Sequence, residues 1–152
     1  MKTLKLPLLC TAIALSSCNI PEFINGSGYI DEKIYTFTDI QNLNLEGDGT
    51  VYIDFESNNT VRMVGDDNII DKYDVTSLDN TISIKPQENY SFNPDQPLEY
   101  FISANILNSL ESQGDFSIEI QDINQTEVNL ELHGDNELLI TGSLDTLNLT
   151  AQ

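Results

Sequence analysis

A Gly-Asp step recurs in three similar stretches of the chain. The two clearest copies are LESQGDFSIEI at residues 110–120 and LELHGDNELLI at residues 130–140, and a looser copy, LNLEGDGTVYI, lies at residues 43–53. Matching positions in the first two copies, such as Gly114 and Gly134, are twenty residues apart. Self-similarity at this period is typical of a repeat fold in which successive coils stack on one another.

Apolar residues alternate with polar ones at a period of two along most of the chain. Pairs with this spacing include Tyr35 and Phe37, Val51 and Ile53, Ile82 and Ile84, and Ile118 and Ile120. Glycine, asparagine and aspartate separate the runs, a pattern that predicts short β-strands of about three to six residues. We therefore expect an all-β solenoid with coils of about 20 residues. Residues 65–74 are compatible with either one short helical turn or a tight loop.

The repeat continues to the last residue of the sequence. Val128, Leu130 and Leu132 correspond to Leu147, Leu149 and Ala151 at an offset of nineteen. A further glycine corner would fall just beyond Gln152, so the stack is expected to stop within a coil and leave an edge strand open to pairing. This predicts a homodimer through the C-terminal solenoid edge, a C-terminally incomplete domain, or a frayed end.

The first eighteen residues have the features of an export signal. Lys2 and Lys5 precede an apolar run at residues 6–15, which is too short to span a bilayer as a helix. The run closes on LSSC, which resembles the bacterial lipobox, in which the cysteine is acylated and becomes the mature N-terminus. We expect a signal peptide at 1–17, lipidated Cys18 with a short tether at 18–25, and one domain at 26–152; an ordinary signal peptide with a chance cysteine is the alternative. Asn19 favours the outer membrane over the inner by resemblance to enterobacterial sorting rules.

Charge and cysteine content exclude several classes of function. Cys10 lies in the signal and Cys18 is expected to carry lipid, so no thiol remains for a disulfide, a metal site or a nucleophile. Without Lys2 and Lys5 the chain keeps four basic residues against twenty-five acidic ones, a net charge of −21. Binding to nucleic acid or to anionic lipid through charge needs a basic face, which this composition does not provide.

Three longer segments together resemble a known bacterial family. They are INGSGYIDEKIYTFTDIQNLNLEGDGTVYI at 24–53, VRMVGDDNIID at 61–71 and NTISIKP at 80–86, followed by the Gly-Asp coils. The positions that carry the resemblance are Gly26, Ser27, Gly28, Phe37, Ile40, Gly47, Val51, Ile53, Gly65, Asp66, Asp67, Asn68, Ile82, Ile84, and the Gly-Asp steps at 114 and 134. In this order they resemble the head GIN domain of auto-transporter adhesins, a domain of unknown function.

The resemblance implies an exported or lipid-anchored protein. It also implies a right-handed parallel β-helix-like fold. Domains of the family usually continue for further coils beyond the point that corresponds to Gln152.

The Gly-Asp corners offer one candidate metal site, because stacked acidic turns hold calcium in some β-solenoids. Each corner has a single aspartate, Asp48, Asp115 or Asp135, whereas calcium requires six to eight oxygen ligands. The alternative, which we favour, is that glycine turns the chain with a positive φ while aspartate bonds its own backbone. We expect no metal and no cofactor.

Two other groups are candidates for catalysis. Asp66 and Asp67 could form a carboxylate pair for polysaccharide cleavage, but adjacent strand residues face opposite sides, so a capping or turn role is favoured. His133 is the only histidine and has no cysteine or second histidine to complete a metal site or a triad. We expect no catalytic residue and no enzymatic activity.

The segment KPQENYSFNPDQP at residues 85–97 holds three prolines and reads as a loop or a hairpin insertion. Its aromatic residues, Tyr90 and Phe92, either contact a partner or fold back over the neighbouring strands. We expect a lipid-anchored binding, adhesion or structural module of the bacterial envelope, whose partner is an envelope protein or a glycan. The alternative is a carbohydrate-active β-helix that uses acidic residues.

Overall fold

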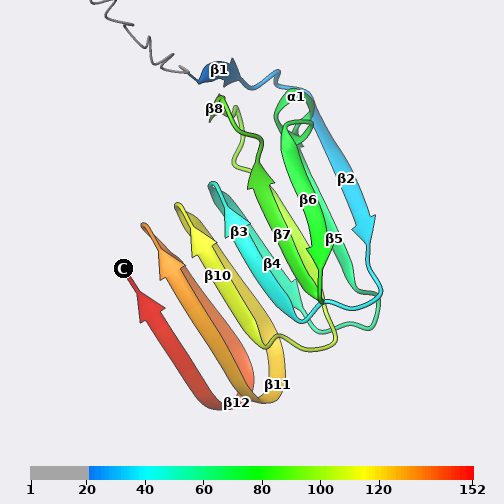
Figure 1. The fold of residues 1–152 in the computed structure, drawn as a ribbon, viewed down its shortest axis with the longest axis vertical. Coiled ribbons are helices and arrows are strands. Elements are labelled where there is room, and N and C mark those ends of the chain that lie inside the picture. The colour runs from blue at the N-terminus through cyan, green and yellow to red at the C-terminus, as the bar shows by residue number, and fades with distance from the viewer. Residues whose placement is uncertain (1–20) are drawn as a thin grey trace, which may run out of the picture.

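The computed structural model describes residues 21–152 and contains twelve strands and one short helix (Figure 1). The strands are β1 (Glu22–Asn25), β2 (Ile30–Thr36), β3 (Asn42–Glu46), β4 (Gly49–Asp54), β5 (Thr60–Asp66), β6 (Tyr73–Leu78), β7 (Thr81–Pro86), β8 (Tyr90–Asn93), β9 (Glu99–Ser103), β10 (Ser109–Gln113), β11 (Phe116–His133) and β12 (Glu137–Ala151), and the helix is α1 (Asp67–Ile70). The prediction of an all-β chain is confirmed, and α1 supplies the short helical turn in residues 65–74. Within residues 21–152, no helix is long and apolar enough to cross a membrane.

The predicted signal peptide and the lipidation site at Cys18 lie outside the described residues. Residues 22–25, expected to belong to the tether, form β1 and pair in parallel with β8. The N-terminal strand is therefore held against the Pro-rich segment.

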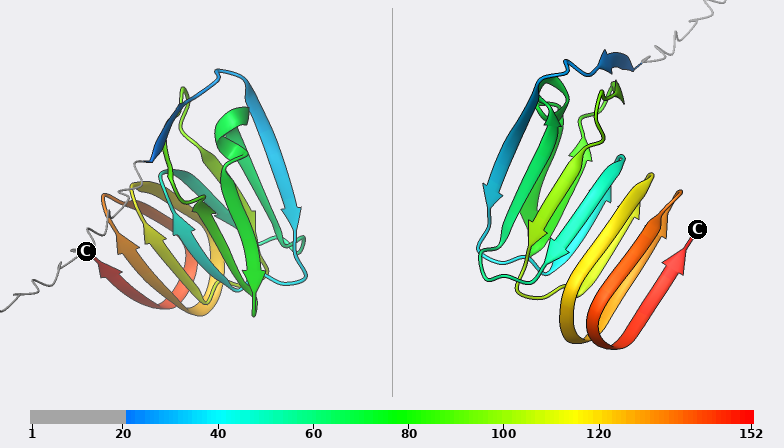
Figure 2. Two further views of the ribbon diagram at one scale, coloured as in Figure 1. Left: turned by 45° about the horizontal axis from the view of Figure 1, so that its top comes forward. Right: turned by 180° about the vertical axis from the view of Figure 1, so that it is seen from behind.

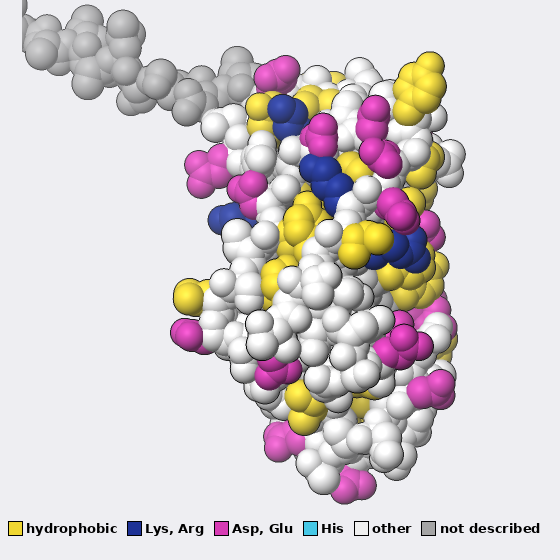
Figure 3. Space-filling view, turned by 90° about the vertical axis from the view of Figure 1, so that its right-hand side faces the viewer, with side chains coloured by type: hydrophobic (Ala, Val, Ile, Leu, Met, Phe, Trp, Pro, Cys, Tyr) yellow, Lys and Arg dark blue, Asp and Glu magenta, His cyan; other side chains and the backbone are white. Residues whose placement is uncertain are grey.

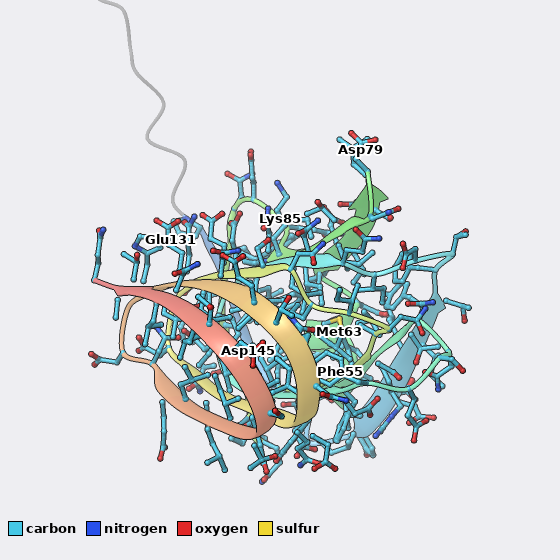
Figure 4. All side chains as sticks on the ribbon, turned by 90° about the horizontal axis from the view of Figure 1, so that it is seen from below. Phe55, Met63, Asp79, Lys85, Glu131 and Asp145 are labelled. Carbon is cyan, nitrogen blue, oxygen red and sulfur yellow. The ribbon has the colours of Figure 1, made fainter. Side chains whose placement is uncertain are left out.

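The remaining ten strands form one sheet that curves until it is nearly closed and barrel-like (Figure 2). Its order is β2-β5-β9-β4-β11-β10-β3-β7-β6, and β12 pairs with β11 outside this path. The long strands β11 and β12 bend, so each contributes to both sides of the barrel (Figure 2). Met63 lies inside this barrel with no exposed surface, whereas Asp79, Lys85 and Glu131 point outward (Figure 4).

The three Gly-Asp stretches stack in the register that the sequence predicts. Leu110 pairs with Leu43 on one side and with Leu130 on the other, and all these pairings are parallel. Beyond the corner, Ile118 pairs with both Val51 and Leu138. The offset of twenty between the second and third copies, and the offset of nineteen in the last turn, are therefore both present.

The rest of the sheet departs from the expected solenoid. Strands β7 and β9 still pair in parallel with β3 and β4. In contrast, β2 with β5, β5 with β9, and β6 with β7 pair antiparallel. Turn chemistry explains the reversal between β6 and β7: Asp79 and Asn80 have φ of +50° and +61°, and a two-residue hairpin of type I′ needs positive φ at both central residues. The fold is thus not a uniform parallel β-helix.

The interior is filled by the apolar members of the alternating pattern. Leu43, Leu110 and Leu130 are each at most 2% exposed, as one column of the stack. In the last coil the burial is incomplete, since Leu147 and Leu149 are 43% and 49% exposed. Strand β12 pairs with β11 on one edge, and no strand of residues 21–152 pairs with its other edge, so this end of the barrel presents half-exposed apolar side chains.

Candidate functional site

A cavity of about 450 Å³ opens between the Pro-rich segment and the first Gly-Asp corner. Residues between Pro86 and Leu98 form one wall. Within this segment, β8 is held in place by its pairing with β1. The opposite wall is the corner between β3 and β4, together with the ring of Tyr73 at the start of β6. The lining residues are Gly47, Asp48, Gly49, Tyr73, Pro86, Tyr90, Ser91, Phe92, Pro94, Pro97 and Leu98.

A row of aromatic rings runs from this cavity into the core. Tyr90 and Phe92 are stacked with their centroids 6.3 Å apart, and Phe92 stacks on Tyr73 at 5.6 Å. Tyr73 then meets Tyr100 edge-on at 6.4 Å, and Tyr100 meets Phe116 edge-on at 6.1 Å. Aromatic contacts at such distances contribute about 0.5–1.5 kcal/mol each beyond area burial, so the wall is held in place before any ligand arrives.

The phenol of Tyr73, which lines the cavity, and that of Tyr100, which packs against Tyr73 in the core, are neutral hydrogen-bonding groups. Burial raises the pKa of Tyr73, and burial raises the pKa of Tyr100 well above its usual value. The hydroxyl of Tyr100 donates to the backbone carbonyl of Asp48 at 3.3 Å. The cavity therefore combines apolar walls with uncharged hydroxyls, while the ammonium of Lys72 lies outside it, 4.9 Å from the centre of the Tyr90 ring.

The sequence left two alternatives for Tyr90 and Phe92, which are contact with a partner and rings that fold back over the neighbouring strands. Both side chains are half-buried, and Phe92 packs against the core cluster. They fold back, as the second alternative predicts, but in doing so they form a wall of the cavity. Sequence reasoning missed the partner of Phe92, Tyr73, which lies nineteen positions earlier. The only indication in the local sequence that Tyr73 is buried was its position three residues after the apolar pair Ile69 and Ile70.

The Gly-Asp corners are structural, with one correction to the expected geometry. Gly114 and Gly134 have φ of +130° and +107°, as predicted for corner glycines. The aspartates, however, do not bond their own backbone. Asp48 accepts the N–H of Asp115 at 3.0 Å, and Asp115 accepts the N–H of Asp135 at 3.0 Å. Stacking places the amide of the next coil within reach of each carboxylate, so the aspartates link the coils.

The corner carboxylates do not converge on a metal position. Among residues 21–152 there is no group of three or more histidine, cysteine, aspartate or glutamate side chains arranged to hold a metal ion. His133 lies at the end of β11 with its Nε2 3.1 Å from Glu131.

Asp66 and Asp67 have separate structural roles. Asp66 is fully buried, and its two carboxylate oxygens accept the N–H groups of Gly28 at 2.7 Å and Asp95 at 2.9 Å. Asp67 accepts the hydroxyl of Ser27 at 2.6 Å. Asp66 thus joins the N-terminal segment and the Pro-rich segment to the barrel. Asp66 occupies the N-cap position of α1, as a capping role predicts, but its side chain makes no hydrogen bond that caps the helix.

The model of one bacterial family matches residues 36–152, which is most of the chain. That family is described as "putative auto-transporter adhesin, head GIN domain", and this chain belongs to it. The resemblance in the sequence is thereby confirmed. A search of curated proteins gives no match.

Three crystal structures have a similar fold. A "putative adhesin" from Bacteroides fragilis is 16% identical with a TM-score of 0.69, and the match covers 85% of this chain and 70% of that one. A "putative lipid binding protein" from Parabacteroides distasonis is 16% identical with a TM-score of 0.64, over 83% and 64% of the two chains. A "putative adhesin" from Parabacteroides merdae is 13% identical with a TM-score of 0.55, over 78% and 58%. This chain therefore spans less than two thirds of the length of the second and third of these proteins.

Proposed function

We propose that this protein is a lipid-anchored, non-enzymatic binding module of the bacterial envelope whose aromatic cavity holds a neutral glycan. The single observation that carries the ligand class is the cavity itself. Rings of Tyr73, Tyr90 and Phe92 provide apolar surface against which the C–H faces of a sugar can pack. Ser91 and the backbone of the Gly47 corner supply polar groups for its hydroxyls.

The composition of the lining favours binding over cleavage. Asp48 is the one carboxylate among the lining residues, and its Oδ1 already accepts the N–H of Asp115. Glycoside hydrolysis uses a pair of carboxylates that flank the scissile bond. The family description, which speaks of adhesins, supports a surface-associated or envelope-associated binding role.

The stacked coils are proposed as the scaffold of this module. We interpret residues 109–152 as turns of a right-handed β-helix-like stack, supported by the parallel register of β10, β11 and β12. Their long outer faces are a second surface on which an envelope protein could bind. The acidic character of the chain keeps such a surface soluble and selects against anionic partners.

A thermal-shift experiment with a panel of neutral oligosaccharides tests the ligand class. A glycan at ten times its Kd stabilises the folded state by about 1.4 kcal/mol and raises Tm. Phe92→Ala should abolish this shift because it removes the central ring of the wall. Tyr52→Ala is the matched control, since Tyr52 stacks on Phe101 at 5.0 Å and does not line the cavity. A shift given by fatty acids but by no glycan would contradict the proposal.

Metabolic labelling with palmitate tests the anchor. The wild type and Cys10→Ala should incorporate label, whereas Cys18→Ala should not. Anchoring through two or three acyl chains is effectively permanent, so Cys18→Ala should also move the protein from the membrane fraction to the soluble fraction. Equal labelling of all three proteins would rule out lipid on Cys18. Fractionation of inner and outer membranes tests the outer-membrane location.

A further inference from the structure

Phe23 and Tyr29 are the two exposed aromatic residues of the described part of the chain, at 61% and 76% exposure. The other ten aromatic side chains in residues 21–152 are buried or half-buried. Both exposed rings lie in the first nine described residues, at the end of the barrel that carries β1 and α1 (Figure 1). We propose that this end, defined by Phe23, Tyr29 and Ile30, is a membrane-contact surface that rests on a phospholipid bilayer. This inference rests on the proposed lipid anchor at Cys18.

The backbone that carries Phe23 is fixed. Phe23 lies on β1 and pairs with Ser91 of β8. The next residue, Ile24, packs against the core, so the alternation of strand side chains turns Phe23 away from the protein. An exposed ring on a paired strand loses little conformational freedom when it enters a membrane interface.

Tyr29 is held by α1. Its carbonyl accepts the N–H of Asp67 at 2.9 Å, and the N–H of Ser27 donates to Oδ1 of Asn68 at 3.0 Å. Ile30 follows Tyr29 and is 50% exposed. Amphipathic aromatic rings such as that of tyrosine concentrate at the boundary between water and the hydrocarbon core, where one part of the ring is wet and the other dry.

The length of chain between the anchor and the fold places this end at the membrane. Cys18 precedes Glu22, the first residue of β1, by four positions. Four residues span at most about 14 Å when fully extended. A protein anchored at Cys18 therefore keeps β1 within reach of the headgroup region, whereas β12 lies at the opposite end of the fold (Figure 1).

The distribution of charge favours the same orientation. Residues 109–152, which include β10, β11 and β12, contain nine acidic residues and no lysine or arginine. The four lysine and arginine residues of the described chain are Lys33, Arg62, Lys72 and Lys85. On the face shown in Figure 3, all basic side chains lie in the upper half. Among the residues described, Lys72 and Lys85 form no ion pair. A bilayer with negative headgroups thus repels the β12 end more strongly than the β1 end.

Single-tryptophan variants test this surface directly, because the chain has no tryptophan of its own. The lipidated full-length protein is made with Phe23→Trp, and separately with Leu139→Trp as the control. Leu139 is 53% exposed and lies on β12. Each protein is incorporated into vesicles of phosphatidylcholine and phosphatidylglycerol with or without brominated acyl chains, and flotation of the same samples reports anchoring.

The Phe23→Trp protein should float, shift its emission to the blue and lose intensity with brominated lipid. The Leu139→Trp protein should float with emission unchanged. Flotation without quenching of the Phe23→Trp probe would overturn the contact surface and leave the anchor standing, whereas loss of flotation would overturn both. A blue shift without quenching would assign the surface to a protein contact and would also overturn the proposal. Both substitutions are at exposed positions, so an unchanged Tm verifies folding.

Discussion

The carboxylate of Asp115 accepts the backbone N–H of Asp135 at 3.0 Å, one coil further along the stack. Asp48 holds Asp115 in the same way, so two carboxylates connect three successive corners. Because backbone N–H groups at sharp corners have no partner in a strand ladder, this contact satisfies donors that water would otherwise have to reach. The corner aspartate is therefore a coupling element between coils.

Replacing Asp115 by alanine should lower the free energy of unfolding by about 1 kcal/mol, because an exposed hydrogen bond is lost. Urea denaturation followed by circular dichroism measures the change. Asp135→Ala is the matched control: its carboxylate accepts no hydrogen bond from any of residues 21–152 and should leave stability almost unchanged. Equal destabilisation by both variants would refute the coupling role.

Gly114 combines a positive φ with a close approach to the coil below. Its φ is +130°, and a Cβ placed on it would collide with the carbonyl oxygen of Gly47. We expect Gly114→Ala to reduce stability by about 3 kcal/mol or more, since strain and collision act together. Gly28→Ala separates the two effects, because Gly28 has φ of +75° but faces only the end of the Asp95 side chain. This control should cost about 1–2 kcal/mol. Thermal unfolding of the two variants provides the comparison.

These corners show which features of the fold the local sequence can predict and which it cannot. The twenty-residue offset predicted which residues pair across the coils, because the alternation of apolar residues and the position of the turn set the register of the strands. The hydrogen-bond partner of Asp115 could not be predicted in the same way. A lone Gly-Asp step is equally compatible with a turn that bonds to itself, and only stacking brings the amide of Asp135 closer.

The cavity was less accessible to prediction than the coils. Its walls come from β8, the corner at Gly47 and the start of β6, and no spacing rule connects these segments. The parallel pairing of β1 with β8 joins residues 68 positions apart, as with Phe23 and Ser91. The antiparallel strands that interrupt the solenoid depend likewise on long-range contacts. A Pro-rich stretch with two aromatics was the only signal, and it indicated a loop without showing what the rings would face.

Stability at alkaline pH should reveal the buried phenol of the cavity. Burial raises the pKa of Tyr73 in the folded state above its value of about 10 in the unfolded chain. Between these two values the unfolded state has lost a proton that the folded state keeps, so stability is fully present below about pH 10 and falls as pH rises beyond it. Urea denaturation between pH 8 and pH 11 should give a shallower decline for Tyr73→Phe than for the wild type. Parallel declines would show that Tyr73 does not contribute.

The open strand at the C-terminal end of the stack provides the last prediction. In β12, Leu147 and Leu149 occupy positions whose counterparts one coil earlier, Val128 and Leu130, are at most 2% exposed. An unpaired edge with half-exposed apolar residues favours pairing with a second copy. We expect the wild type to form a dimer at high concentration by sedimentation velocity.

An inward-pointing charge discourages edge pairing, so Leu149→Lys should shift this protein to the monomer while its strand content, followed by circular dichroism, is retained. The control is Leu78→Lys, because Leu78 is 75% exposed but lies on β6, the last strand of the sheet order, which pairs with β7 and not with β12. It should leave the dimer intact. A wild type that stays monomeric at every concentration would exclude self-pairing through β12. Dissociation by both variants would instead place the interface at another surface, since the two positions share only their exposure and residue type.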